Sequence, residues 1–200
     1  DVVNRLTEAP GFVVVTGDLV NQGTRPVELK AYAGAIRNCR TACYNVVGNH
    51  DYGGKRRKTE NYELHLGPRY YSFDVGRYHF IAKDIIASQN DGVAYTREQQ
   101  WIEEDIRRNA GDRRIIVLQH LLPTNAELDW WSRFETAAIF SGHWHGRRER
   151  LYKGILDVNS STLRFGGIDR SPRGFRVVHV NGDKIACEWR VGQQARRMEV

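Results

Sequence analysis

The sequence predicts an α/β fold: a sandwich of two sheets with mixed strands, flanked by helices. Two patterns carry this prediction. Up to residue 145, apolar runs typical of buried strands alternate with segments of helical periodicity, whereas later strand-like runs follow one another between glycine-containing turns. A length of 200 residues suits one domain with two sheet layers, so we treat residues 1–200 as a single domain.

The first part of the chain supplies two apolar strands and a helix between them. Residues 12–16 form the first strand and residues 43–47 the second. The helix is expected over residues 24–37, where Pro26 suits the first turn and the apolar positions share one face: Leu29, Ala33 and Ile36. A shorter helix is expected over residues 59–66.

The middle of the chain begins with a hairpin, because residues 70–74 and 78–83 alternate in polarity on either side of a glycine-containing turn. A helix is expected to start at Thr96, since Gln99 completes the pattern of a capping box. Its buried stripe consists of Trp101, Ile102 and Ile106. Three further elements follow: a strand over 113–119, a helix over 125–134 and a strand over 137–141.

The last quarter of the chain is expected to form a second, largely antiparallel sheet. Its short strands cover residues 151–152, 155–159, 175–180 and 184–191. Asn181 and Gly182, between the last two, are a strong hairpin turn.

Composition narrows the classes of function. No apolar run approaches the ~18–20 residues of a membrane-spanning helix. The net charge of +6 favours anionic ligands such as phosphates, but the arginines are spread out and show no nucleic-acid-binding signature. The 3 cysteines argue against a disulfide framework; Cys39 and Cys43 either pair or stay free, which leaves the redox compartment open. The oligomeric state is not indicated.

Side chains that bind metals follow four of the apolar strands: Asp18, then Asn49, His50 and Asp51, then His120, and finally His143 and His145. Carboxylate, amide and imidazole groups together suit zinc, manganese or iron. A lone histidine at the end of a strand is usually structural. Four strands that deliver such groups at one sheet edge favour a single metal site instead.

These motifs, in this order, resemble those of the calcineurin-like metallophosphoesterases: Gly17-Asp18, Gly48-Asn49-His50-Asp51, His120 and Gly142-His143-Trp144-His145. The order and spacing fit over residues 11–145, and residues 99–103 of the expected helix also resemble that family. Residues 146–200 carry no motif. The resemblance implies the metallophosphoesterase fold and a hydrolase with two divalent metal ions (Mn, Fe or Zn) as cofactors.

The resemblance also assigns the metal ligands. Asp18 would bridge the two ions. The shell of the second ion would be completed by Asn49, His120 and His143. His145 would bind the first ion.

His50 would not be a ligand. It would face the substrate phosphate and protonate the leaving oxygen or steady the transition state, with Asp51 orienting and charging it. Two ions ~3.5–4 Å apart can hold a hydroxide that attacks phosphorus in line. The expected function is therefore metal-dependent hydrolysis of a phosphate mono- or diester, with a small phosphate ester as partner. The alternative is a non-catalytic module on the same fold that binds a metal or a partner.

The family pattern begins with an Asp-x-His strand, and no residue before Gly17 matches it. We expect that this strand is missing, because the later motifs are intact and the chain opens at Asp1 without Met. The first metal site would then be incomplete. A truncated or processed N-terminus also favours an extracytoplasmic location.

Several further residues have two interpretations each. Basic residues either attract phosphate or form a solvated surface: Lys55, Arg56, Arg57, Lys58, Arg147, Arg148 and Arg150. Three aromatic residues either stack on a ring of the substrate or pack against the protein: Tyr52, Tyr95 and Trp144. Asp84 either supports the site or lies in a turn, and three histidines are expected on the surface or in the core: His65, His79 and His179.

Overall fold

The structure is a computed structural model that describes residues 3–52, 59–85, 92–163 and 167–191. In chain order its main elements are β1 (Phe12–Val15), α1 (Pro26–Ile36), β2 (Ala42–Asn45), α2 (Glu60–Leu66), β3 (Tyr71–Val75), β4 (Tyr78–Ala82), α4 (Gly92–Asp105), β5 (Arg114–Leu118), α5 (Asn125–Trp131), β6 (Thr136–Ser141), β7 (Arg148–Tyr152), β8 (Ile155–Asn159), β9 (Gly174–Asn181) and β10 (Lys184–Val191). A 3-10 turn (Val3–Arg5) precedes β1, and a π-helical turn (Ile106–Ala110) extends α4.

A six-stranded sheet forms the first layer, in the order β3-β4-β5-β6-β8-β7. The four inner strands run parallel, and β3 and β7 pair antiparallel at the edges. Every residue of β4 is buried, and β5 is buried from Ile115 onward. Parallel strands covered on both faces need such continuous apolar runs, which is why these strands are visible in the sequence.

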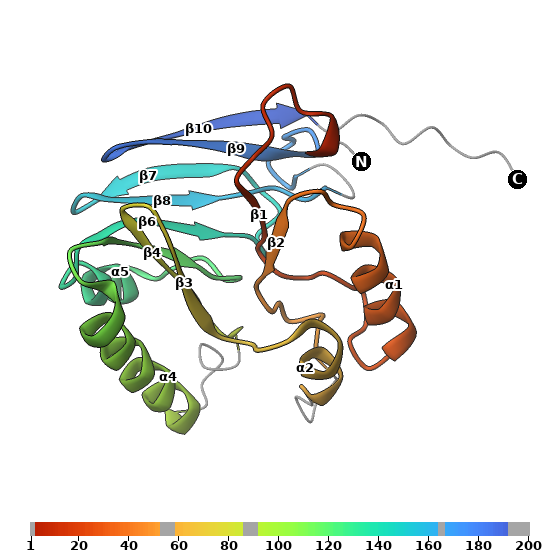
Figure 1. The fold of residues 1–200 in the computed structure, drawn as a ribbon, viewed down its shortest axis with the longest axis horizontal. Helices are drawn as coiled ribbons and strands as arrows, with labels where there is room; N and C mark the ends of the chain where they lie inside the picture. Colours follow the sequence, from red (N-terminus) through yellow and green to blue (C-terminus); the bar gives the residue numbers. More distant parts are fainter. Residues whose placement is uncertain (1–2, 53–58, 86–91, 164–166, 192–200) are drawn as a thin grey trace, which may run out of the picture.

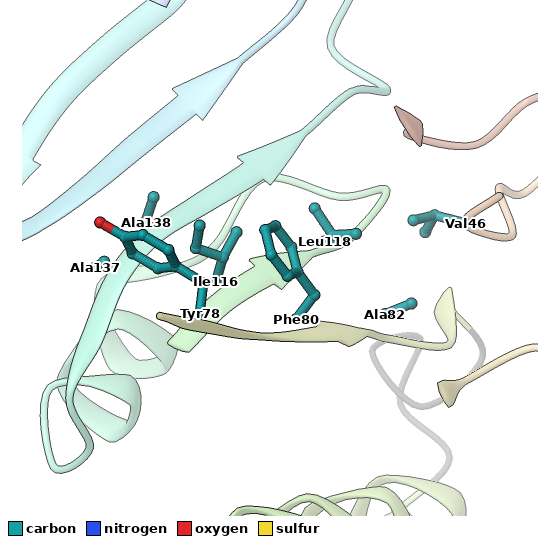
Figure 2. Close-up of a cluster of buried hydrophobic side chains, with 8 residues drawn as sticks. All are labelled: Val46, Tyr78, Phe80, Ala82, Ile116, Leu118, Ala137 and Ala138. Carbon is teal, nitrogen blue, oxygen red and sulfur yellow. The ribbon is translucent and has the colours of Figure 1, made fainter. Parts of the chain in front are cut away.

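Two strand pairs form the second layer: β1 and β2 are parallel, whereas β9 and β10 make an antiparallel hairpin. Phe12 and Val14 of β1 and Ile185 of β10 pack on a buried cluster of the first sheet. Figure 2 shows side chains of this cluster from β4, β5 and β6, with Val46 reaching them from the segment after β2. The predicted sandwich of mixed strands is confirmed.

Helices α4 and α5 cover the opposite face of the first sheet. Ile102 of α4 and Leu128 and Trp131 of α5 pack against apolar residues of β4, β5 and β6. Figure 1 shows these helices at the left, with α1 and α2 at the right, beside β1 and β2. Helices therefore flank the sandwich on two sides.

The prediction for the last quarter of the chain was partly wrong. The hairpin of β9 and β10 forms as expected, with Gly182 at a φ of 59°. However, β7 and β8 extend the first sheet, because β8 pairs parallel with β6 from Leu156 to Asn159. For Cys39 and Cys43, the structure shows free thiols.

The expected start of α4 was also wrong. This helix begins at Gly92, so Thr96 lies inside it and is not its N-cap. A capping box is present at α5, where the Thr124 hydroxyl accepts a hydrogen bond from the Glu127 amide and the Glu127 carboxylate accepts one from the Thr124 amide. The two patterns look alike in sequence, but Thr124 directly precedes its helix whereas Thr96 lies inside one.

His79 is a core residue that fixes α4 to the hairpin of β3 and β4. Its imidazole is 1% exposed and lies between two carboxylates. Nδ1 is 2.6 Å from Asp74 Oδ1, and Nε2 is 2.8 Å from Asp105 Oδ2. A polar link thus joins a strand to a helix inside the apolar layer.

A second polar cluster lies between the sheet and the helices, at the carboxyl ends of β4 and β5. Lys83 contacts Glu127 (Nζ to Oε1, 3.1 Å), and Glu98 accepts a hydrogen bond from the Asp84 amide at 2.7 Å. Asp84 also forms an ion pair with Arg69 and is buried, so it does not lie in an exposed turn; its support of the site stays a prediction. Burial raises the pKa of Glu98 to about 7, although Lys83 opposes the rise.

The raised pKa of Glu98 makes stability depend on pH. An acid that ionises less readily in the folded state contributes its full stability below its ordinary pKa of 4.5, and this contribution is lost as the pH rises towards 7. At about 1.4 kcal/mol for each pKa unit, the loss is about 3 kcal/mol. Urea unfolding at several pH values should show a decline in stability between pH 4.5 and 7 that is smaller in Glu98→Gln than in the wild type. Below pH 6, the buried Asp51, whose pKa is also raised, keeps its own part of the decline in both proteins. The exposed Glu103→Gln on the same helix serves as the control; a decline of wild-type size in Glu98→Gln would show that Glu98 does not contribute to it.

Candidate metal centre

Four strands deliver the candidate ligands to one place. Asp18 follows β1 and Asn49 follows β2 in the second layer, while His120 follows β5 and His143 follows β6 in the first. The layers meet where the Nδ1 atom of His120 lies 2.7 Å from the Thr16 carbonyl oxygen. The predicted convergence at the carboxyl ends of the strands is therefore present.

The donor atoms surround His120. Its Nε2 atom is 3.1 Å from Asn49 Oδ1, 3.2 Å from His143 Nδ1 and 3.3 Å from Asp18 Oδ2. Ligand atoms of Asp18, His120 and His143 all lie within 4.8 Å of one another. Four donors at these separations can share one cation.

The chemistry of this donor set fits a metal ion. A neutral His120 that donates its Nδ1 proton to Thr16 presents the lone pair of Nε2 to two oxygens and a second imidazole. Lone pairs that face one another are stabilised by a cation placed between them. A set of two imidazoles, one carboxylate and one amide oxygen is borderline in softness and suits zinc, manganese or iron.

Electrostatics favours the protonation states that ligands need. Burial would raise the pKa of Asp18, but contacts with His120 and His50 lower it below its usual value. Burial and the neighbouring His120 ring lower the pKa of His143. At neutral pH, Asp18 is therefore ionised and His143 is neutral, as coordination requires.

Glycines and strained residues shape the loops. Asp18, His143 and His145 have φ values of 55°, 62° and 29°, in the left-handed region that side chains rarely adopt. Gly48 has no room for a side chain, because a Cβ atom there would lie 2.2 Å from the Asp18 amide nitrogen. Strain of this kind is typical of functional sites, where surrounding structure holds it.

His50 lies beside the donor group without joining it. Its amide donates a hydrogen bond to Asp18 Oδ1 at 3.0 Å, and its ring Nδ1 is 2.9 Å from the Asn21 carbonyl oxygen. The residue is exposed, so its ring can meet a ligand. No signal in the sequence marks Thr16 and Asn21 as the groups that orient these rings, because both use only main-chain oxygens.

The hydrogen bonds of the described residues do not include one between Asp51 and the His50 ring, and the role of Asp51 in orienting that ring stays a prediction. Asp51 is fully buried and accepts hydrogen bonds from the amides of Gly48 (2.7 Å) and Val20 (3.1 Å). Burial raises its pKa to about 6, while these two hydrogen bonds lower it. Asp51 therefore ties the loop after β1 to the loop after β2.

The other predicted residues are not among the three whose ligand atoms lie within 4.8 Å of one another. His145 is half-buried and its carbonyl accepts a hydrogen bond from the Ile168 amide at 2.8 Å, so its role as a ligand of a first ion stays a prediction. Arg148 and Arg150 both pair with the buried Asp157. The basic run of residues 55–58 lies outside the described residues.

A sequence profile of the calcineurin-like phosphoesterases matches residues 1–147. The chain belongs to this family. It is 26% identical over 216 residues to the human serine/threonine-protein phosphatase CPPED1, covering 92% of this chain and 68% of that protein. The zebrafish (Danio rerio) CPPED1 is 27% identical over 217 residues, covering 92% and 69%. Membership and these relatives support phosphoester hydrolysis by a phosphatase-type hydrolase of a generally metal-dependent family.

Two solved structures show the same fold. The phosphopantetheinyl hydrolase PptH of Mycobacterium tuberculosis superposes with a TM-score of 0.54 at 13% identity, covering 80% of this chain and 83% of that chain. GAP50 of Plasmodium, described as an anchor in the inner membrane complex, gives a TM-score of 0.58 at 13% identity, covering 95% and 75%. At such identities the likeness concerns the fold alone. A helix with the length and apolarity for a membrane span is absent from the described residues, and the expected extracytoplasmic location has no support.

Gly48→Ala should lower both the stability of the fold and the affinity of the candidate centre for metal. The new Cβ atom would meet the main chain of Asp18, so we expect a loss of about 2–3 kcal/mol in the free energy of unfolding and weaker binding of Mn²⁺. Gly34→Ala is the matched control, since open space surrounds Gly34 in α1 and alanine should stabilise that helix by about 0.5–1 kcal/mol. Urea unfolding and calorimetric titration with Mn²⁺ measure both effects. Wild-type stability and affinity in Gly48→Ala would contradict the close approach.

Proposed function

We propose that this protein hydrolyses a phosphate mono- or diester at a metal centre held by Asp18, Asn49, His120 and His143. The observation that carries the proposal is that donor atoms of Asp18, Asn49 and His143 all lie 3.1–3.3 Å from Nε2 of His120, the fourth donor. Two divalent ions would, when bound, offset the charge of the phosphate and activate a water molecule for attack on phosphorus. The name of the CPPED1 relatives makes monoesters the first class to test.

The chain's own residues supply the remaining steps. The Oδ2 atom of Asp18 faces His120, while its Oδ1 atom accepts a hydrogen bond from the His50 amide. These two contacts fix the carboxylate between the ligand group and the loop of His50. The first ion would share Asp18 with the second and would be bound by His145. The exposed His50 ring, held at Nδ1 by Asn21, would turn Nε2 towards the phosphate and donate a proton to the leaving oxygen.

Removal of metal tests the proposal directly. Dialysis against a chelator should abolish hydrolysis of p-nitrophenyl phosphate or its diester, and Mn²⁺ or Zn²⁺ should restore it, because the ions would supply the activated water that attacks phosphorus. Elemental analysis before and after dialysis gives the number of ions per chain. An intact, folded protein that hydrolyses neither ester with any of these metals would support the non-catalytic alternative instead.

His50 and Asn49 should separate catalysis from metal binding. His50→Ala should lower kcat by about 10²–10⁴-fold with unchanged metal content, because it removes a proton donor and no ligand. Asn49→Ala should lower metal content, because it removes one of the four donors. His179→Ala, on the half-exposed surface of β9, is the control and should change neither quantity. Loss of metal in His50→Ala would refute this division of roles.

A further inference from the structure

An open cavity of about 370 Å³ adjoins the candidate metal centre. Its walls are formed by Leu121, Leu122, His143, Trp144 and Arg148. His143 belongs to both places, since its Nδ1 atom is in the donor group and the residue also lines the cavity. A molecule whose phosphate occupies the metal centre would therefore extend into this cavity with the group attached to the phosphate.

Trp144 gives the cavity an exposed aromatic surface. The residue is 50% exposed, although a tryptophan side chain has a large apolar area that proteins usually bury. Its amide donates a hydrogen bond to the Gly142 carbonyl at 2.6 Å, and the residues on either side of it are in the left-handed region. The main chain of the metal-binding loop thus holds Trp144 beside His143. Tyr52, by contrast, is buried in the core, so it packs and does not stack; the side chain of Tyr95 lies outside the described part.

Arg148 forms a second wall that suits a flat ring. Its Nη2 atom is 2.8 Å from Asp157 Oδ2, and that carboxylate is fully buried. The Nε atom of Arg148 is buried and has no hydrogen-bond partner within residues 3–52, 59–85, 92–163 and 167–191. A guanidinium fixed in this way presents a planar cation, which stacks favourably on aromatic faces. Leu121 and Leu122 add apolar contact.

We infer that this cavity binds an aromatic group of the phosphate ester, between Trp144 and Arg148. The inference rests on the proposed function, because it places the phosphate at the donor group. The expected substrates are esters in which an aromatic ring lies close to the phosphate. The ring can belong to an aryl group, a tyrosine side chain or a nucleobase.

Phosphonates test this inference without turnover. The Mn²⁺-loaded protein is titrated by calorimetry with 2-phenylethylphosphonate, 2-cyclohexylethylphosphonate and ethylphosphonate, which share the phosphonate head and differ in the attached group. We expect the phenyl compound to bind at least about tenfold more tightly than ethylphosphonate and about threefold more tightly than the cyclohexyl compound.

Variants locate the effect. Trp144→Ala should reduce the phenyl-to-ethyl affinity ratio to below about threefold, and Trp144→Phe should keep most of it, because phenylalanine retains a stacking surface. Leu151→Ala is the matched control: Leu151 is 74% exposed on β7 and does not line the cavity, so the ratio should not change.

The outcomes separate the two proposals. Four results would each overturn the inference, whether or not esters are hydrolysed: a wild-type phenyl-to-ethyl ratio near one, equal binding of the phenyl and cyclohexyl compounds, an unchanged ratio in Trp144→Ala, or no binding of any of the three phosphonates. If the ratios hold while no ester is hydrolysed with any metal, the cavity assignment stands and the hydrolytic function fails.

Discussion

The hydrogen bond between His120 Nδ1 and the Thr16 carbonyl joins the two layers where the site forms. It depends on the packing of Phe12 and Val14 against the first sheet, because that packing sets the position of the strand that ends at Thr16. It also fixes which nitrogen of His120 faces the other donors. The packing between the two layers thus also sets the geometry of the ligands.

Local patterns were sufficient to predict the inner strands of the first sheet, because parallel strands buried on both faces are continuous apolar runs. The edge strand β7 was expected over 151–152 only and spans Arg148–Tyr152. Local patterns did not predict which strands pair with one another. β8 and β9 are both short strands bounded by turns, yet β8 joins the first sheet and β9 the second layer. The choice is made by non-local contacts, such as the fit of β8 along β6, that no window of sequence contains. The start of α4 was predicted wrongly for the same reason: it too was inferred from a local pattern alone.

The donor group was predictable for a related reason. Ligands that follow neighbouring parallel strands meet at one edge of their sheet, so His120 and His143 could be brought together from their positions alone. Asp18 follows β1 in the second layer, and it joins them because the two layers pack together. Asp51 could not be understood in this way. It occupies the same motif as Asn49, but its partners are the amides of Gly48 and Val20, and main-chain partners leave no trace in the identity of a residue.

The cost of building the site is concentrated in a few residues. Left-handed φ values at Asp18 and His143 are each unfavourable by about 1–3 kcal/mol. Position 48 leaves room only for glycine, because two loops approach closely there. The buried Asp51 carboxylate holds both loops from behind through the Gly48 and Val20 amides, although its own burial is also unfavourable and raises its pKa. Asp51 therefore acts on the site through the backbone: it holds the loops of Asp18 and Asn49 at the spacing that a shared cation needs.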